Sequence, residues 1–154
     1  MNHFEGTATA HITAKPIDVF GLVTDLDRLP EWNRRIAAVL DTPAALVPGS
    51  EWTVRMHVPI VGRWKSRSTL AQFDPDRLLF AYTSKRVDNN PTDGTWTWQL
   101  TPVDDGTRVD VCWEGHPRTF VRKVVAAPIR SRQLHDEVAH SLQTLTELAV
   151  ARPA

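Results

Sequence analysis

Alternation of apolar and polar residues along the middle of the chain constrains the fold more than any other feature. Residues 52–57, 95–100 and 108–113 each place an apolar side chain at every second position. Such alternation is typical of a β-strand with one face in the core and the other in solvent. The segment Asp104-Asp105-Gly106 predicts a hairpin turn between the last two strands. The chain is therefore predicted to build an antiparallel sheet that is covered on one face.

Four further segments fit strands of the same sheet: residues 7–13, 36–40, 63–73 and 78–84. Segments rich in turn-forming residues separate them. Pro59 and Gly62 indicate a hairpin connection, and residues 88–94 hold two Asn, two Asp, a Pro and a Gly and are predicted to form a loop. The predicted order is one strand, two short helices, about six antiparallel strands and one long C-terminal helix.

The helices are predicted from their caps and their periodicity. Pro16 opens the first, which is predicted over residues 16–24. The second is short and extends through Leu29 and Trp32. The third follows from apolar residues at spacings of four, four, three and four, which lie on one helical face: Leu134, Val138, Leu142, Leu145 and Ala149.

Pro128 is the one residue that conflicts with a longer C-terminal helix. Since proline lacks the backbone N–H and clashes with the preceding turn, a kink or break is expected near Ala127. No internal repeat or low-complexity segment interrupts the order of elements. Residues 1–151 are therefore predicted to form a single domain, followed by a short tail at 152–154.

The charge balance and the cysteine content restrict partners and compartment. The 154 residues include 18 Lys+Arg and 18 Asp+Glu, so the formal net charge is zero. A nucleic-acid-binding surface needs a basic excess instead. The sole cysteine, Cys112, excludes an intramolecular disulfide, and neither a signal peptide nor a membrane-spanning stretch is visible. We expect a cytoplasmic monomer or homodimer with no nucleic-acid partner and no transmembrane segment.

Five short stretches, in this order and at this spacing, resemble the START-like or SRPBCC superfamily, and within it the polyketide cyclase/dehydrase and lipid-transport branch. They are Ala14-Lys15-Pro16-Ile17-Asp18-Val19-Phe20, Asp25-Leu26-Asp27-Arg28-Leu29-Pro30-Glu31-Trp32, Pro48-Gly49-Ser50-Glu51-Trp52, Phe73-Asp74-Pro75-Asp76-Arg77-Leu78 and Asp105-Gly106-Thr107-Arg108-Val109. The resemblance extends from Thr7 to about Val150. Most of these residues serve turns and packing, so the stretches indicate a fold and not a reaction.

The resemblance implies an α+β architecture called the helix-grip fold. In it, a curved seven-stranded antiparallel sheet wraps around a long C-terminal helix, and two short helices follow the first strand. A deep apolar cavity lies between sheet and helix. Members of the superfamily bind lipids, sterols, polyketides or plant hormones there, and some catalyse cyclisation or dehydration. A fold shared by binders and enzymes does not decide the function.

Tryptophan is over-represented, with six Trp beside five Phe and one Tyr. Four of the tryptophans occupy the apolar side of predicted strands, Trp32 is expected near the cavity mouth, and the direction of Trp64 stays open. Their rings either line a pocket for a ring-containing ligand or fill the core. The candidate ligand-binding residues are Trp32, Trp52, Met56, Trp64, Tyr82, Trp96, Trp98, Val111, Trp113, Phe120, Val124, Leu134 and Val138.

Reactive groups form no compelling constellation in the sequence. The histidines do not follow metal-ligand spacing, so neither a metal nor another cofactor is predicted. Glu114 and His116 end a strand that points toward the predicted cavity, although a solvated strand end is the simpler interpretation. Strand alternation allows only one of Ser66 and Arg67 to face inward. A basic run is interpreted as a solvated helix face, with an anionic partner as the alternative: Arg118, Arg122, Lys123, Arg130 and Arg132.

Three functions follow from these observations. The first is binding of an apolar, aromatic or polycyclic small molecule, or a lipid, in the cavity between sheet and helix. The second is a polyketide cyclase or dehydratase that acts on a bound polyketide through positioning and general acid–base groups. The third is a protein-interaction module whose apolar opening receives a partner.

Overall fold

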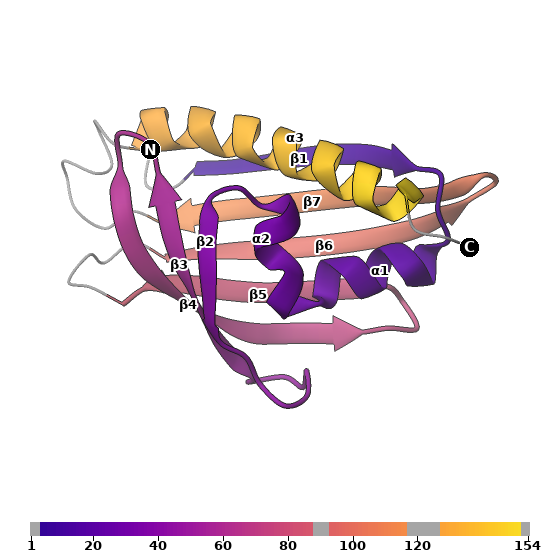
Figure 1. Ribbon diagram of the computed structural model, residues 1–154, viewed down its shortest axis with the longest axis horizontal. Helices are drawn as coiled ribbons and strands as arrows, with labels where there is room; N and C mark the ends of the chain where they lie inside the picture. Colours follow the sequence, from indigo (N-terminus) through magenta and orange to yellow (C-terminus); the bar gives the residue numbers. More distant parts are fainter. Residues whose placement is uncertain (1–3, 88–92, 117–126, 152–154) are drawn as a thin grey trace.

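One antiparallel sheet and the helices on a single side of it make up the structure. The computed structural model describes residues 4–87, 93–116 and 127–151 (Figure 1). The strands are β1 (Phe4–Ile12), β2 (Ile36–Asp41), β3 (Glu51–Val58), β4 (Gly62–Asp74), β5 (Leu79–Arg86), β6 (Asp93–Val103) and β7 (Gly106–His116). The helices are α1 (Pro16–Thr24), the 3₁₀ helix η1 (Leu26–Arg28), α2 (Leu29–Trp32) and α3 (Ala127–Ala151).

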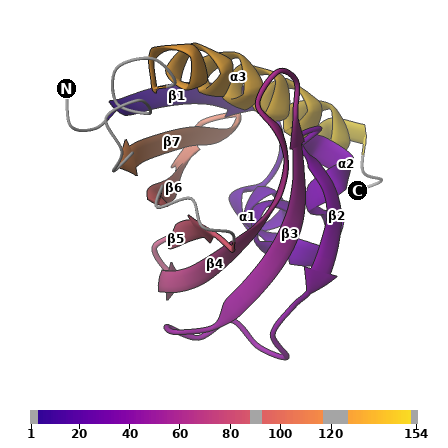
Figure 2. The same ribbon diagram turned by 90° about the vertical axis from the view of Figure 1, so that its left-hand side faces the viewer.

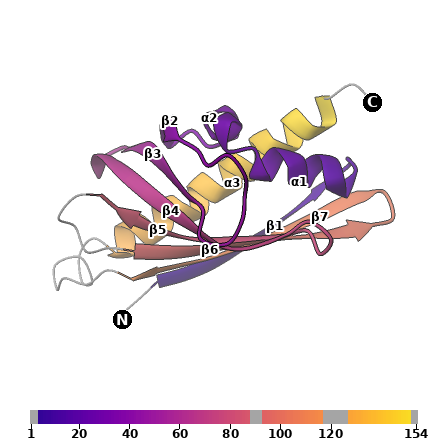
Figure 3. The same cartoon turned by 90° about the horizontal axis from the view of Figure 1, so that it is seen from below.

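The seven strands lie in the order β1-β7-β6-β5-β4-β3-β2. Consecutive strands from β2 to β7 are neighbours. β1 pairs with β7, so β1 and β2 are the two edge strands of the sheet. The strands follow an arc, and α3 lies across its concave side (Figure 2). All the helices lie on that side of the sheet (Figure 3). This arrangement confirms the helix-grip fold and the α+β class.

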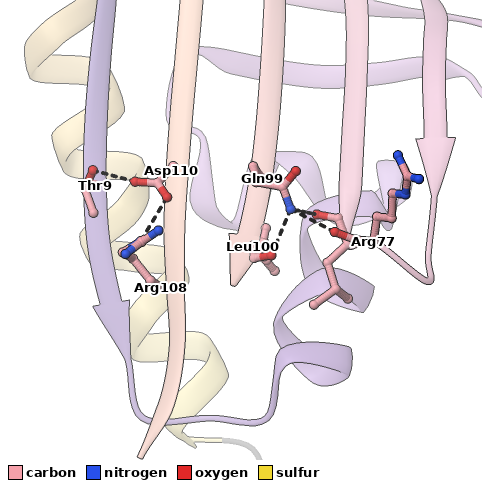
Figure 4. Close-up of polar contacts among 7 residues, drawn as sticks. Thr9, Arg77, Gln99, Leu100, Arg108 and Asp110 are labelled. Atoms are coloured by element: carbon pink, nitrogen blue, oxygen red, sulfur yellow. Dashed lines mark hydrogen bonds and ion pairs between the residues drawn. The ribbon is translucent and has the colours of Figure 1, made fainter. Parts of the chain in front are cut away.

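The two faces of the sheet differ as the alternation predicts. The outer face of β7 carries Asp110, which accepts hydrogen bonds from Thr9 Oγ1 at 2.8 Å and from Arg108 Nε at 3.0 Å (Figure 4). On β6, Gln99 Nε2 donates to the backbone carbonyl of Arg77 at 2.8 Å. The inner face packs with the helices into one core, whose strand residues include Val54, Leu70, Phe80, Leu100, Val109 and Val111.

The structure describes the C-terminal helix from Ala127 on, next to the position where a break was predicted. Pro128 lies in the first turn of α3, which begins at Ala127. The predicted apolar face of α3 is confirmed, since its five residues are all buried. Phe120 and Val124 lie outside the described residues.

Strand ends depart from the prediction by a few residues, as is usual where no cap fixes them. β1 starts at Phe4 instead of Thr7, and β6 already starts at Asp93, inside the predicted loop. The rest of that loop and the predicted tail at 152–154 lie outside the described residues. Within the described ranges, no helix is long and apolar enough to cross a membrane.

Candidate functional site

A cavity of about 250 Å³ lies between the concave face of the sheet and α3. Its walls come from α2, from strands β2 to β7 and from the first half of α3. Aromatic and aliphatic side chains predominate, and a smaller number of hydroxyl and charged groups interrupts them. The exposed lining residues Val61 and Lys85 place its opening beside the β3–β4 turn and the end of β5.

All six tryptophans line this cavity. They form contacting pairs: Trp32 meets Trp98 edge-on with centroids 5.4 Å apart, and Trp96 stacks on Trp113 at 5.7 Å. Trp52 meets the Tyr82 ring edge-on at 5.3 Å. Four of the rings are at most 4% exposed, whereas Trp64 and Trp96 are half-buried. The buried rings thus form the core and the cavity wall at once.

A row of small residues explains why these large rings leave space. Strand pairing places Ser68 opposite Ser84, Ser84 opposite Gly94, and Gly94 opposite Gly115. Four adjacent strands therefore carry Ser, Ser, Gly and Gly at one level of the inner face. All four residues line the cavity. Farther along the same strands, the row Phe80, Trp98 and Val111 fills the same layer with larger side chains.

The structure brings ten of the thirteen candidate residues to the cavity. They are Trp32, Trp52, Met56, Trp64, Tyr82, Trp96, Trp98, Trp113, Leu134 and Val138. Val111 was expected to line it but is fully buried in the filled row beside Trp98. Phe120 and Val124 lie outside the described residues. The open question about Trp64 is answered by its place in the cavity wall.

Trp32 lies away from the cavity mouth where it was expected. It is 4% exposed and packs edge-on against Trp98, in the deep part of the wall that α2 supplies. The end near the opening carries Trp64, with the guanidinium carbon of Arg86 4.4 Å from the ring centroid. Trp32 takes this place because α2 is short and turns its apolar side into the core.

Hydroxyl groups form the polar part of the inner walls. Ser68 Oγ and Ser84 Oγ lie 2.7 Å apart and share a hydrogen bond. Of the two alternatives on β4, Ser66 faces the cavity. Arg67 is exposed on the outer face, where its Nε lies 3.9 Å from Glu51 Oε2. Ser141 on α3 adds a hydroxyl from the opposite wall.

A buried ionic group was missed from the sequence. Glu137 on α3 is 6% exposed, lines the cavity and pairs with Arg130, which lies two turns earlier on the same helix. Its Oε2 also lies 3.8 Å from Arg35 Nε, which follows α2. Arg130 is thus no part of a solvated face, although Arg132 is exposed as predicted. The spacing of Arg130 and Glu137, about two helical turns, was the available signal.

Tyr82 presents a neutral phenol to the cavity. Burial raises the pKa of its hydroxyl well above the usual range, and a side-chain hydrogen bond with Trp98 offsets part of that rise. Since an indole nitrogen only donates, Trp98 donates to the phenol oxygen. The hydroxyl therefore keeps its proton and acts as a hydrogen-bonding group, not as a base.

Charged groups near the opening complete the site. Glu114 lines the cavity, and its Oε1 lies 3.4 Å from His116 Nε2. The side chains of Glu114 and His116 are 41% and 40% exposed, as expected of a solvated strand end, although Glu114 also lines the cavity. Among residues 4–87, 93–116 and 127–151, no group of three or more His, Cys, Asp or Glu side chains is placed to hold a metal ion. Cys112 is exposed on the outer face.

Comparison with solved structures finds the same fold in several proteins. The aromatase/cyclase Zhui from Streptomyces sp. R1128 has a TM-score of 0.71 at 19% identity, covering 97% of this chain and 94% of that one. TTHA0849 from Thermus thermophilus has a TM-score of 0.76 at 19% identity, covering 97% and 100%. The di-domain aromatase/cyclase StfQ of the steffimycin biosynthetic pathway has a TM-score of 0.77 at 14% identity, covering 96% and 50%.

Sequence comparison gives the family. A search of curated proteins found no match. Residues 3–149 match the family described as polyketide cyclase / dehydrase and lipid transport, which is nearly the whole chain. The chain therefore belongs to the polyketide cyclase/dehydrase and lipid-transport family, within the START-like superfamily that its motifs resemble.

Proposed function

We propose that the protein binds a small, ring-containing apolar molecule between the sheet and α3. The observation that carries this proposal is the convergence of all six tryptophans on one cavity of about 250 Å³. Ligand sites of drug-sized molecules usually enclose about 300–1,000 Å³. The smaller volume favours a compact molecule of one or two fused rings over a long flexible lipid.

Burial of the ligand surface supplies the driving force. Removing about 250 Å² of apolar ligand surface from water, at about 25 cal/mol per Å², contributes about 6 kcal/mol before ordering costs. Contacts with Trp96 and Trp64, which are only half-buried, add the preference of aromatic rings for stacked and edge-on geometry. With these aromatic contacts offsetting the ordering costs, a net of about 6 kcal/mol corresponds to a dissociation constant of about 10–100 μM for a bicyclic probe.

A cavity-filling variant with a matched control tests the proposal. Ser84→Leu places a larger side chain in the row of small residues, whereas Thr83→Leu alters the outer face of the same strand. Saturable quenching of Trp fluorescence by 2-naphthol is expected for the wild type and for Thr83→Leu, and loss of it for Ser84→Leu. Equal affinity in all three proteins would refute binding in this cavity. Native mass spectrometry of the purified protein shows whether a ligand co-purifies.

A second candidate function is aldol cyclisation of a bound polyketide followed by loss of water. It is favoured by the half-buried Glu114 at the opening and by the protonated phenol of Tyr82 in the wall. The Glu114 carboxylate would take a proton from a methylene between two carbonyls, and the carbanion would attack a ketone carbon. The Tyr82 hydroxyl would donate a hydrogen bond to the developing alkoxide. Protonated Glu114 would return its proton to the alkoxide, which becomes a hydroxyl. The regenerated carboxylate would then take a second methylene proton while that hydroxyl leaves as hydroxide, and the proton and the hydroxide would combine as water.

Product analysis separates the two functions. Incubation with a poly-β-ketone thioester, followed by mass spectrometry, detects loss of water from a cyclised product. Under the cyclase proposal, Glu114→Gln slows this reaction by about 10²-fold or more without weakening ligand binding. A ligand that is recovered unchanged at the uncatalysed rate would exclude the enzyme and leave the binding protein.

A further inference from the structure

A pair of hydrogen-bonded serines on the sheet has one hydroxyl proton that the bond between them does not use. Ser68 and Ser84 lie directly opposite each other on β4 and β5, with their Oγ atoms 2.7 Å apart. Each hydroxyl has one donor and two acceptor positions. Whichever serine donates within the pair, the hydroxyl of the other has a proton that the pair does not use. Ser68 is only 3% exposed, so this pair is held inside the cavity wall and not at the surface.

The opposite wall carries an unpaired hydroxyl. Ser141 on α3 is 5% exposed and lines the cavity. Serine and threonine inside a helix often donate to the carbonyl four residues earlier, as Thr144 does to His140 and Thr146 to Leu142. Ser141 has no such bond, and its hydroxyl finds no partner among the residues that the structure describes. Among the described residues, Ser141 Oγ is not one of the fully buried polar atoms that lack a partner, so it is accessible to a ligand or to water in the cavity.

The charged groups of the cavity are less suited to this task. Glu137 is engaged by Arg130 and Arg35 together. Arg86, Asp93 and Glu114 also have interaction partners. Recruiting any of them to a ligand would break an existing contact, whereas the serine hydroxyls can bond without breaking one.

On the proposed binding function, we infer that the cavity selects aromatic molecules that carry oxygen substituents, such as phenols and aryl ketones. The Ser68–Ser84 pair binds a ligand oxygen from the sheet side, and Ser141 binds one from the helix side. The surrounding tryptophans contact the rings, so affinity comes from ring burial and selectivity from the hydroxyls. These three serines are specificity-determining residues.

The experiment compares naphthalene with 2-naphthol by isothermal titration calorimetry. The two probes share the bicyclic ring and differ by one hydroxyl, so the ratio of their dissociation constants isolates its contribution. The variants are the double variant Ser68→Ala/Ser84→Ala, Ser141→Ala, and the control Ser131→Ala, which changes a serine of α3 outside the cavity lining. Replacing both members of the serine pair by methyl groups leaves no unpaired hydroxyl and is expected to preserve folding.

The wild type and Ser131→Ala are expected to bind 2-naphthol about five- to tenfold more tightly than naphthalene, the value of one hydrogen bond. If the 2-naphthol hydroxyl bonds to the sheet side, the double variant brings the ratio of the two dissociation constants close to one; if it bonds to the helix side, Ser141→Ala does so. In either case the affinity for naphthalene is unchanged. A ratio near one in the wild type, or an unchanged ratio in both variants, overturns the inference while ring binding stands. Failure of both probes to bind the wild type overturns the proposed function together with it.

Discussion

The indole ring of Trp113 on β7 lies against the backbone of Gly6 on β1. The two residues are directly paired, and a β-carbon at Gly6 would lie 2.3 Å from Trp113 Cζ2. The missing side chain lets the indole extend over the edge of the sheet, where His135 of α3 meets it edge-on at 5.0 Å. On the other side Trp113 stacks on Trp96, in the cavity wall. Gly6 therefore sets the position of two cavity tryptophans.

The first prediction is that Gly6→Ala displaces Trp113 and destabilises the fold. The added methyl group overlaps a rigid ring that Trp96 and His135 hold from both sides, so the free energy of unfolding should fall by about 1–3 kcal/mol. Urea denaturation followed by Trp fluorescence measures the change. Gly21→Ala is the control, because its β-carbon would meet nothing within 4 Å on α1. The control should gain about 0.5–1 kcal/mol from helix propensity; an equal effect in both variants contradicts the argument.

The sequence predicts which residues of a single strand face the cavity, but it does not predict which residues of neighbouring strands lie side by side in the cavity wall. Period-two alternation assigned Trp52, Trp96, Trp98 and Trp113 to the inner face, because a strand turns successive side chains to opposite sides. Alternation within one strand does not give the register between strands. The row of Ser68, Ser84, Gly94 and Gly115 exists only when the pairings of four strands are known. For the same reason Val111 could not be recognised as a core residue.

The second prediction concerns the ionic group of Glu137. Glu137→Gln removes the charge that both Arg130 and Arg35 face, leaving two partly buried guanidinium groups close together. The free energy of unfolding should fall by about 2 kcal/mol or more, because a broken buried ion pair leaves uncompensated charge. Equilibrium unfolding in urea measures it, since urea does not screen charge as guanidinium chloride does.

Glu31→Gln is the matched control for Glu137→Gln. Glu31 also binds an arginine, with Arg28 Nε 2.8 Å from its Oε2, and this hydrogen bond lowers the pKa of the Glu31 carboxyl. Because this pair is exposed to solvent, its loss should change stability little. A loss of stability in Glu31→Gln as large as that in Glu137→Gln would show that burial does not determine the effect.

The ionic group also shows which part of the site the sequence hides. Arg130 belongs to a run of basic residues, and such runs usually form solvated faces. Only the packing of α3 against the segment after α2 brings Arg35 to Glu137. That contact joins two distant parts of the sequence, and no local pattern encodes it. Hydrophobic patterning predicts where a helix is buried, but the polar residues at the edge of that face need the tertiary structure.

The third prediction is that the single tyrosine of the chain does not ionise in the folded state up to about pH 11. An unperturbed tyrosine has a pKa of about 10, and burial raises the pKa of Tyr82 well above that value. Absorbance at 295 nm, which reports tyrosinate, should therefore stay flat while the protein is folded. The same titration in concentrated urea should show ionisation near pH 10. A normal titration curve in the folded protein would place Tyr82 in contact with solvent.

The same shift predicts a loss of stability in alkali. Between the pKa of the unfolded chain and the higher pKa of the folded one, the unfolded chain binds fewer protons than the folded protein. Stability is then fully present below about pH 10 and falls as the pH rises above it. Tyr82→Phe removes this contribution, so its unfolding free energy should depend less on pH between about pH 10 and 11 than that of the wild type. A parallel dependence in both proteins would assign the loss to other groups.

The fourth prediction concerns Ile60, which combines two unfavourable features beside the cavity opening. It is 95% exposed and has a φ of 72°, a left-handed conformation that is rare for a β-branched residue. Ile60→Gly removes the steric cost of about 1–2 kcal/mol without losing buried surface, so the melting temperature should rise.

Leu78 is the matched control. It also has a positive φ, 56°, but packs against the core. Leu78→Gly relieves the same strain and loses core contacts worth more, so its melting temperature should fall. Opposite signs in the two variants establish that the strain at Ile60 is uncompensated by packing, whereas a fall in both would show that the Ile60 side chain stabilises the turn.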